Sequence, residues 1–260
     1  MLKCLHTAAS GMSAQQFKID VLSNNLANVN TAGFKRSRAD FEDLLYQIIR
    51  TPGVKTGNNS PATGLDVGSG VRVAGTERIM QAGDLKQTQN PLDIAIEGDG
   101  FLQVRQADGS LAYTRTGTLR TDADGQIVTP AGDPLDPPIV IPQDAVQVTV
   151  APDGQVSVLV GGRNEPLQIG RIELSRFVNP ASLRPLGHNL FASTTASGDA
   201  MVATPGVDGA GTLLQGFIET SNVKVVEEMV DLIASQRAYE LNSKAIQAAD
   251  NILQRLVNMR

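Results

Sequence analysis

The sequence of 260 residues contains few of the residues that catalytic and binding sites commonly use. Its one cysteine, Cys4, excludes an internal disulfide framework and a multi-cysteine metal site. The two histidines, His6 and His188, lie too far apart to form a short metal-binding motif. Tryptophan is absent and aromatic residues make up 4%, so the anchors typical of ligand pockets are scarce. We therefore expect no metal and no cofactor.

Charge and hydropathy exclude further classes of protein. Lysine and arginine number 22 against 27 aspartate and glutamate residues, which gives a net charge of −5 without any basic block, so we expect no nucleic-acid partner. No apolar run approaches the ~18 residues of a membrane span, so the chain is not expected to be membrane-embedded. Residues 1–20 carry charged side chains and no apolar run, so we expect no cleaved signal peptide.

Proline and glycine are concentrated in the middle of the sequence. All prolines lie between Pro52 and Pro205, only Gly11 and Gly33 precede residue 51, and no glycine follows Gly216. Because both residue types interrupt helices and mark turns, this distribution predicts long helices at the two ends and β-structure between them.

The N-terminal end has a seven-residue repeat of apolar residues. Leu5, Met12, Ile19 and Leu26 form one line, and Ala8, Leu22 and Val29 form a second line in which Gln15 is a polar exception. This is the pattern of a coiled-coil seam over about three heptads. The repeat ends in an asparagine cluster before Gly33, which is typical of a helix C-terminus.

The C-terminal end shows a second, alanine-rich repeat. The side chains of Thr220, Ser221 and Asn222 could cap a helix that begins there. One line consists of Ala234, Leu241 and Ala248, and another of Ala238, Ala245, Ile252 and Met259. The repeat fits a long core helix of one globular domain or an intermolecular or end-to-end coiled coil. We favour the coiled coil, because the stripes at both ends flank a middle of different character. The predicted assembly interface is Leu5, Met12, Ile19, Leu22, Leu26, Ala234, Leu241, Ala245, Ala248 and Ile252.

The middle of the sequence predicts strands and tight turns. Asp-Gly pairs at residues 108–109, 124–125 and 153–154 lie between strand-like segments, which is a strong hairpin signal. Residues 92–100 predict a half-buried strand whose Asp93, Glu97 and Asp99 face solvent. Residues 51–70 predict an extended loop or ribbon.

Few residues suggest catalysis. The sequence has no nucleophile elbow and no phosphate-binding loop. Asp93, Glu97 and Asp99 could form an acid/base pair for sugar hydrolysis, but their alternation with apolar residues favours a solvated strand face. Composition therefore indicates a non-enzymatic protein that forms polymers.

Three motifs resemble those of the flagellar axial proteins of the rod and hook, and the resemblance spans the chain. They are SNNLANVNTAGFKR at residues 23–36, NPLDIAIEGDGFLQV at 90–104 and ETSNVKVVEEMVDLIASQRAYELNSKAI at 219–246. The signature residues of the first motif are Asn24, Asn25, Leu26, Ala27, Asn28, Thr31, Gly33, Phe34 and Lys35. Residues 41–53 and the length of the chain resemble the distal rod members of this family.

The resemblance implies an α+β fold in which long N- and C-terminal helices form one discontinuous coiled-coil domain with a β-rich domain inserted. The expected parts are residues 1–35 with 220–260, a connector at 36–70, and the β-rich outer domain at 71–219.

The resemblance also implies a structural function. Such proteins leave the cytoplasm through the flagellar type III export apparatus and polymerise helically into a hollow rod. The rod crosses the periplasm and peptidoglycan and transmits torque from motor to hook. The implied partners are copies of the chain itself, proximal rod proteins, the hook protein and the bushing rings around the rod. The alternatives are a proximal rod or hook subunit of the same family, or a secreted enzyme or binding module that acts on cell-wall glycan.

The apolar stretch formed by Phe41, Leu44, Leu45 and Tyr46 is predicted to stiffen the rod by packing against a neighbouring subunit. The alternative is that residues 38–70 form a slack linker.

Overall fold

The computed structural model describes residues 2–50, 63–162 and 165–258. Residue contacts divide the chain into two compact units. Met1–Leu26, Ser37–Glu77 and Lys224–Arg260 form the helix–ribbon unit, and Ala27–Arg36 with Arg78–Val223 form the β unit. The ribbon residues are thus grouped with the terminal helices. The three-part division expected from the sequence stays a prediction.

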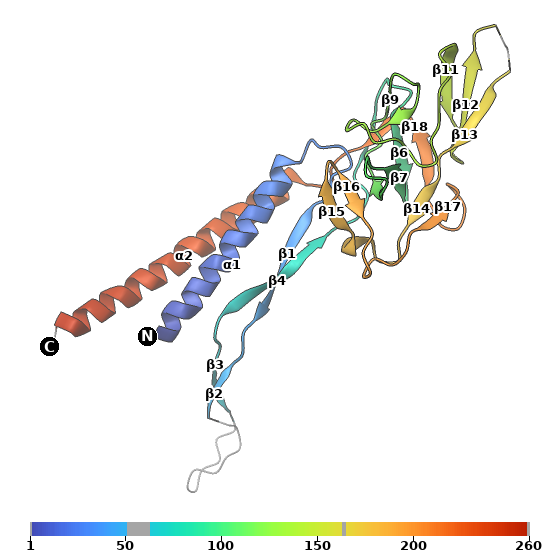
Figure 1. Cartoon of the computed structure of the whole chain (residues 1–260). Coiled ribbons are helices and arrows are strands. Elements are labelled where there is room, and N and C mark those ends of the chain that lie inside the picture. Colours follow the sequence, from blue (N-terminus) through green and yellow to red (C-terminus); the bar gives the residue numbers. More distant parts are fainter. Residues whose placement is uncertain (1, 51–62, 163–164, 259–260) are drawn as a thin grey trace. The chain divides into compact units, whose positions relative to one another are not determined.

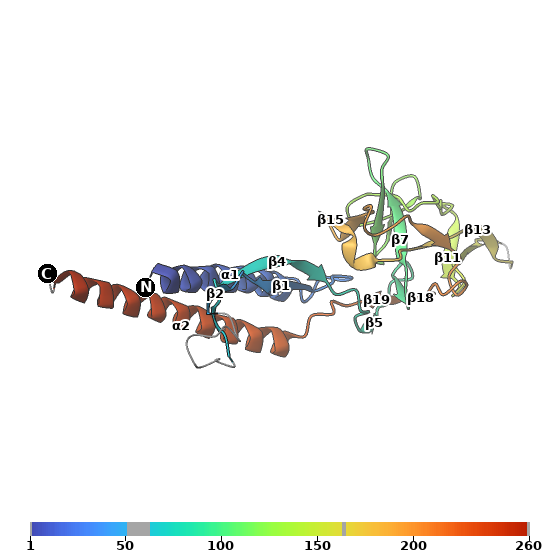
Figure 2. The same cartoon turned by 90° about the horizontal axis from the view of Figure 1, so that it is seen from below.

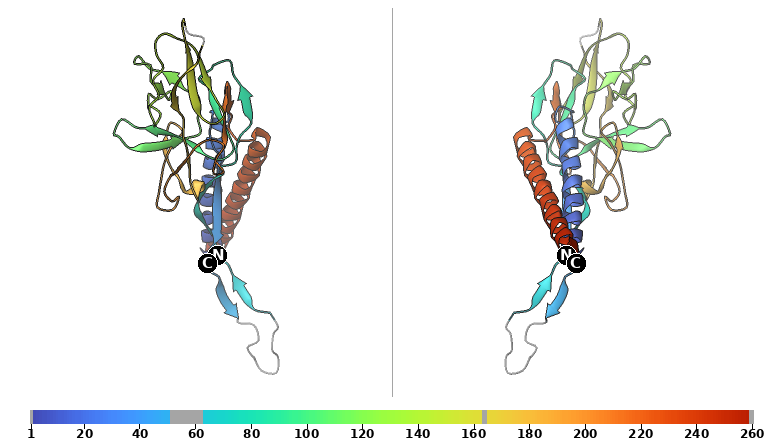
Figure 3. Two further views of the ribbon diagram at one scale, coloured as in Figure 1. Left: turned by 90° about the vertical axis from the view of Figure 1, so that its right-hand side faces the viewer. Right: turned by 90° about the vertical axis from the view of Figure 1, so that its left-hand side faces the viewer.

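Two long helices run side by side in opposite directions in the helix–ribbon unit (Figure 1, Figure 3). They are α1 (Leu2–Ala27) and α2 (Val225–Asn258). A Cβ atom on Gly11 of α1 would lie 3.0 Å from the Asn242 side chain of α2, so the glycine permits close approach. The predicted α+β fold, with packed terminal helices and an inserted β-rich region, is confirmed.

The helix pair buries mostly small or polar side chains of α2. Its buried residues include Glu228, Ser235 and Ala249, which recur at multiples of seven residues and therefore share one face. On α1 the buried residues include Ala8, Ala14 and Leu22. The contact inside the chain consequently leaves most large apolar side chains of α2 uncovered.

The start of α2 differs from the sequence prediction. Thr220, Ser221 and Asn222 precede the helix, which begins at Val225. Thr220 Oγ1 donates to the Asp84 carbonyl, and Asn222 Oδ1 accepts from the Arg36 amide. The prediction that these residues cap the helix is wrong, because the helix starts beyond them and the side chains of Thr220 and Asn222 bind other segments of the β unit.

A two-stranded ribbon follows α1. Strand β1 (Ser37–Asp43) pairs with β4 (Val71–Arg78), as Figure 2 shows, and β2 (Gln47–Arg50) pairs antiparallel with β3 (Leu65–Val67), both labelled in Figure 1. The ribbon expected within residues 51–70 is thus present at Leu65–Val67, and residues 51–62 lie outside the described residues.

The described β unit is built around a six-stranded sheet with the order β15-β16-β8-β7-β14-β17. A three-stranded sheet and three strand pairs surround it. The strands of the large sheet are β7 (Phe101–Arg105), β8 (Leu111–Thr114), β14 (Leu174–Arg176), β15 (Arg184–Gly187), β16 (Leu190–Ala192) and β17 (Met201–Ala203). The three-stranded sheet contains β11 (Ala145–Val150), β12 (Gln155–Val160) and β13 (Leu167–Arg171). The pairs are β9 (Arg120–Thr121) with β10 (Ile127–Val128), β6 (Ile94–Glu97) with β18 (Thr212–Gln215), and β5 (Leu85–Gln87) with β19 (Phe217–Glu219); a short 3₁₀ helix spans Pro180–Ser182.

The six-stranded sheet has a hydrophobic core on each face. Leu102 lies opposite Leu174 in the register, and both belong to the larger aliphatic core. Phe101 and Tyr113 point to the other face, where they join Phe177 in an aromatic cluster. Tyr113 and Phe177 meet edge to face with ring centroids 4.8 Å apart.

The predicted Asp-Gly hairpins are confirmed, since these turns connect β7 with β8, β9 with β10, and β11 with β12. The prediction that residues 92–100 form a half-buried strand with one solvent-exposed face is wrong. Ile94, Ala95 and Ile96 of β6 are all buried, as is Asp93 before them. Antiparallel pairing with β18 and packing inside the aliphatic core enclose both faces of β6.

Gly117→Ala is expected to destabilise the β unit, because a Cβ atom there would lie 1.5 Å from the Ile94 carbonyl oxygen. The backbone must move and weaken the hydrogen bond from Ile94 N to Gly117 O. The matched control is Gly75→Ala in β4, where nothing lies within 4 Å of the new atom. Denaturant unfolding should show that the free energy of unfolding falls by ~1–3 kcal/mol in Gly117→Ala and does not fall in the control. Equal stability of both variants would contradict this account of β6.

Candidate functional site

Asn25 of the first motif links three elements of the helix–ribbon unit. Its buried side-chain amide donates to the Ser37 carbonyl at 2.8 Å and to Glu228 Oε2 of α2 at 3.0 Å. Its Oδ1 accepts the Ser37 amide at 2.9 Å. A single carboxamide therefore sets α1 against α2 and fixes the first residue of β1.

Asn28, Thr31 and Gly33 of the same motif turn the chain after α1. Thr31 donates from its amide to the Asn28 carbonyl and from Oγ1 to Asn28 Oδ1, which forms the turn. Gly33 has a φ of +68° and is buried so closely that a Cβ atom would lie 2.8 Å from the Thr116 amide nitrogen. Only glycine fits this position without strain. Phe34 is half-buried, as is Leu26, whereas Asn24 and Ala27 are exposed.

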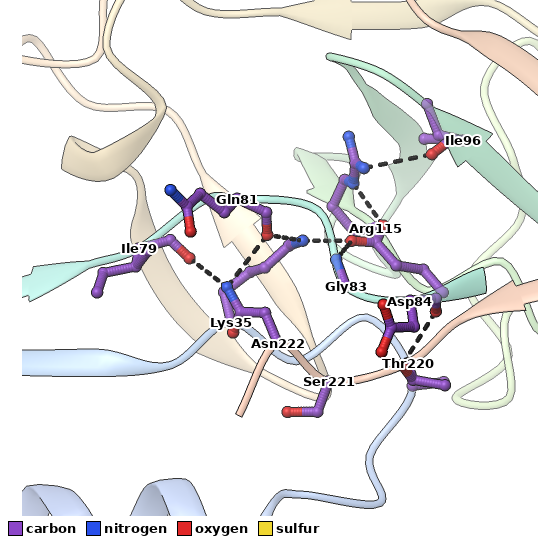
Figure 4. Close-up of polar contacts among 12 residues, drawn as sticks. Lys35, Ile79, Gln81, Gly83, Asp84, Ile96, Arg115, Thr220, Ser221 and Asn222 are labelled. Carbon is purple, nitrogen blue, oxygen red and sulfur yellow. Dashed lines mark hydrogen bonds and ion pairs between the residues drawn. The ribbon is translucent and has the colours of Figure 1, made fainter. Parts of the chain in front are cut away.

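An ionic cluster of Lys35, Arg115 and Glu219 lies buried in the β unit. Figure 4 labels Lys35 and Arg115 of this cluster. Lys35 Nζ donates to Glu219 Oε1, and Arg115 Nε donates to Glu219 Oε2 at 2.8 Å. The Gly83 amide also donates to Glu219 Oε1, at 2.9 Å. The side chain of Glu219 has no solvent exposure, so one carboxylate satisfies two buried cations in a medium of low dielectric constant.

Backbone carbonyls complete the coordination of the two cations. Lys35 Nζ donates to the Gln81 carbonyl at 2.7 Å. Arg115 Nη1 donates to the carbonyls of Gly98 and Gly100 at 2.8 and 2.9 Å, so it also fixes the turn between β6 and β7. Burial lowers the pKa of Lys35, the nearby Arg115 lowers it further, and Glu219 opposes both effects.

Asn222 joins the same segments beside the ionic cluster. Its Oδ1 accepts the Arg36 amide at 2.8 Å, while its Nδ2 donates to the carbonyls of Ile79 and Gln81 (Figure 4). Residues 33–36, 79–84 and 219–222 are thus bonded to one another. The sequence motifs include Lys35 and Glu219 but not Arg115, and they predict neither the burial nor the pairing of these residues, because nothing in an isolated charged residue indicates burial.

The predicted assembly residues of α2 share one exposed face. Ala234, Leu241, Ala245, Ala248 and Ile252 are all exposed in the single chain. Val226, Val230 and Ile233 extend this face toward the start of α2, and together these eight residues form the outer stripe of α2. Val226 is 75% exposed and Leu241 66% exposed. On α1, Leu22 is buried, and Leu5, Met12, Ile19 and Leu26 are half-buried.

The ribbon also exposes apolar side chains. Leu45 is 88% and Ile48 64% exposed, and Tyr46, Ile49, Leu65 and Val67 are exposed as well. Phe41 and Leu44 are half-buried. We call Leu45, Tyr46, Ile48, Ile49, Leu65 and Val67 the ribbon patch.

Residues of α1 hold the ribbon. Lys3 Nζ donates to Gln47 Oε1 at 3.0 Å and to the Val67 carbonyl at 3.1 Å. Ser10 Oγ accepts the Val71 amide at 3.4 Å. The ribbon is therefore fixed to its own helix at both of these places.

The carboxylates considered for sugar hydrolysis do not form a matched pair on a solvated face. Asp93 is buried and accepts a hydrogen bond from Asn90 Nδ2 at 2.9 Å, whereas Glu97 and Asp99 are exposed. The Asp93 side chain thus stabilises the turn before β6. The interpretation of the three residues as one solvated face is wrong.

Comparison with known families and proteins identifies the group to which the chain belongs. Residues 5–35 match the flagella basal body rod protein family, residues 95–158 the D1 domain of flagellar hook protein FlgE/F/G, and residues 214–259 the C-terminal region of flagellar basal body rod FlgEFG proteins. The flagellar basal-body rod protein FlgG of Buchnera aphidicola subsp. Acyrthosiphon pisum is 48% identical over 98% of this chain and 99% of its own length. The FlgG proteins of Caulobacter vibrioides and Bacillus subtilis are 46% and 38% identical, and each match covers both chains fully.

The chain belongs to the FlgG family of flagellar basal-body rod proteins. Membership confirms the predicted resemblance and the structural, non-enzymatic class. No described helix is long and apolar enough to cross a membrane. Each member of the ionic cluster lies in, or at the end of, a different matched segment, so the cluster joins the three segments that match the rod and hook families.

Glu219→Gln is expected to lower the free energy of unfolding of the β unit by ~3–5 kcal/mol, because two buried cations lose their carboxylate. Denaturant titration followed by near-UV circular dichroism measures the change. Arg237→Gln is the matched control, since it breaks the exposed Arg237–Glu240 pair and should cost at most ~1 kcal/mol. A loss as small as that of the control would show that the ionic cluster contributes little.

Proposed function

We propose that this FlgG-family chain, a structural subunit of the flagellar distal rod, polymerises helically into a hollow, stiff shaft that transmits torque from motor to hook. The observation that carries the proposal is full-length similarity to FlgG proteins together with apolar surfaces that the single chain leaves uncovered. The proposed partners are further copies of the chain, the proximal rod proteins, the hook protein and the rings around the rod. Export through the flagellar type III apparatus is part of the same proposal.

The outer stripe of α2 supports a helix–helix contact between copies. Burying a valine, leucine or isoleucine side chain stabilises a contact by ~1.5–3 kcal/mol, and the stripe carries five such residues, from Val226 to Ile252. Ala234, Ala245 and Ala248 between them let a second helix approach closely. A contact between two different surfaces of the same chain yields a helical polymer when the rotation between neighbouring copies does not close a ring.

Leu241→Asp is expected to prevent polymerisation and leave the single chain folded. The residue is exposed in the chain, so the charge is tolerated until a partner helix desolvates it. Sedimentation measures polymer formation, and circular dichroism measures folding. Gln236→Asp is the control, because it adds the same charge at an exposed position of α2 away from the stripe. Normal polymers and motility with Leu241→Asp would place the assembly contact elsewhere.

The ribbon patch supports a second contact that stiffens the polymer. A two-stranded ribbon alone buries little surface, and this one exposes apolar side chains while Lys3 and Ser10 hold it to α1. Because the ribbon is anchored, a neighbouring subunit packed on the patch cannot slide freely. This arrangement favours a stiffening role over that of a slack linker.

Ile49→Asp is expected to give rods that still form but bend more easily. The charge weakens packing on the ribbon patch, while the outer stripe of α2 remains intact. Electron microscopy of purified rods measures curvature and persistence length. Arg50→Gln changes the adjacent exposed polar residue and should leave the rods straight. Equally straight rods from both variants would show that the ribbon is only a linker and does not stiffen the rod.

The position along the rod distinguishes the distal assignment from the proximal rod and the hook. Labelling the chain in isolated basal bodies should place it in the distal rod, next to the hook. A label in the proximal rod or in the hook would overturn this part of the proposal.

A further inference from the structure

Residues 33–36 and 219–222, close to the N-terminal and C-terminal ends of the β unit, lie next to each other and run in the same direction. The Gly33 amide donates to the Glu219 carbonyl at 2.8 Å, and the Asn222 amide donates to the Phe34 carbonyl at 3.4 Å. Partners therefore advance together along both segments, from 33 with 219 to 34 with 222. We call residues 33–36 and 219–222, with the bonds between them, the end-segment clamp.

Side chains reinforce the end-segment clamp. The Arg36 amide donates to Asn222 Oδ1 at 2.8 Å, and Lys35 is bonded to Glu219 in the buried ionic cluster. Lys35 and Glu219 are both about 1% exposed. Water therefore cannot readily replace the charge-assisted bond between the two segments as they are strained.

The direction of the segments determines how force acts on these bonds. The chain first enters the β unit at Ala27, leaves it after Arg36 for the ribbon, returns at Arg78 and leaves it for the last time after Val223. The two segments therefore lie close to the first entry and the last exit of the chain. Tension applied at those ends pulls two parallel neighbours in opposite directions along their length. All the bonds between them are then loaded together in shear, whereas an antiparallel arrangement would be opened one bond at a time.

We infer that the end-segment clamp is a mechanical element that keeps the β unit folded when tension pulls at the two ends of its chain. Lys35 is its central positioning residue, because its side chain is the ionic link between the segments. Arg115 binds the same carboxylate but connects it to the β6–β7 turn, which lies away from this path of force. The biological meaning of the clamp rests on the proposed rod function, but its mechanical behaviour can be measured on the single chain.

Single-molecule force spectroscopy on the full chain tests the inference. Handles are attached at Ala27→Cys and Lys224→Cys, both exposed positions, after the exposed Cys4 is replaced by serine. Lys35→Met is expected to raise the unfolding rate at fixed force by about 10- to 100-fold along this axis. All chains compared carry the same helices, so the difference between them reports the end-segment clamp.

A second pulling axis separates mechanical resistance from general stability. Handles at Ala107→Cys and Ala196→Cys, also exposed, load a part of the β unit that contains neither Lys35 nor Glu219. Lys35→Met should change the rate along this axis much less than along the first. Arg115→Met is the matched control and should raise the rate along both axes to a similar extent. If the Arg115→Met chain does not fold, Arg115→Lys is used as the control. Lysine keeps the charge, but its shorter side chain reaches the Gly98 and Gly100 carbonyls less well.

The outcomes are distinct. A selective effect of Lys35→Met on the axis between residues 27 and 224 supports the end-segment clamp. Equal effects on both axes, or no effect on either, would overturn it and leave Lys35 with a role in stability alone. Failure of the rod proposal would appear instead in polymerisation and localisation, which this measurement does not involve.

Discussion

The β unit depends on one buried carboxylate. Glu219 accepts hydrogen bonds from Lys35, Arg115 and the Gly83 amide, and each donor belongs to a different part of the sequence. Two cations cannot be kept in the interior without an anion, because desolvation disfavours their charged forms. The position of Glu219 therefore determines where the N-terminal segment, the β6–β7 turn and the strand β19 come together. Hydrophobic packing alone, which is non-directional, would not specify this arrangement so narrowly.

The helix–ribbon unit is held together mainly by small and polar side chains, and it exposes apolar ones. Inside the chain, α2 presents Glu228, Ser235 and Ala249 to the buried face, and a specific polar contact from Asn25 sets its position. Five of its large aliphatic residues, from Val226 to Ile252, lie exposed on the outer stripe. Apolar burial is the main non-specific source of binding free energy, so the exposed stripe can supply it to the proposed contacts between copies. The ribbon repeats the pattern, with polar anchors on α1 and apolar side chains exposed.

The sequence predicts those features that depend on local or periodic patterns. The terminal helices follow from the absence of proline and from the heptads, and the hairpins follow from Asp-Gly pairs, since both signals act within a few residues. The wrong predictions concern distant partners. Asn222 has the residue type of a helix cap, but the Arg36 amide and two distant carbonyls bind its side chain instead. Asp93 alternates with apolar residues, but it is buried beside a strand pair whose second strand comes from the far end of the chain. The predicted assembly and stiffness residues stay predictions, because a second copy decides them.

Sequence separation also explains why the ionic cluster could not be read from the sequence and what it means for folding. Lys35 and Glu219 are 184 residues apart, and Arg115 and Glu219 are 104 apart. Contacts at such separations require closure of long loops, whose entropic cost must be met before the contact contributes. Lys35 and Arg115 therefore gain their counterion only after the chain has been supplied as far as residue 219. In the helix–ribbon unit, Asn25 and Glu228 are separated by 203 residues. Both units are thus completed by the C-terminal part of the chain, so the same segment that carries the outer stripe of α2 also closes the fold that presents it.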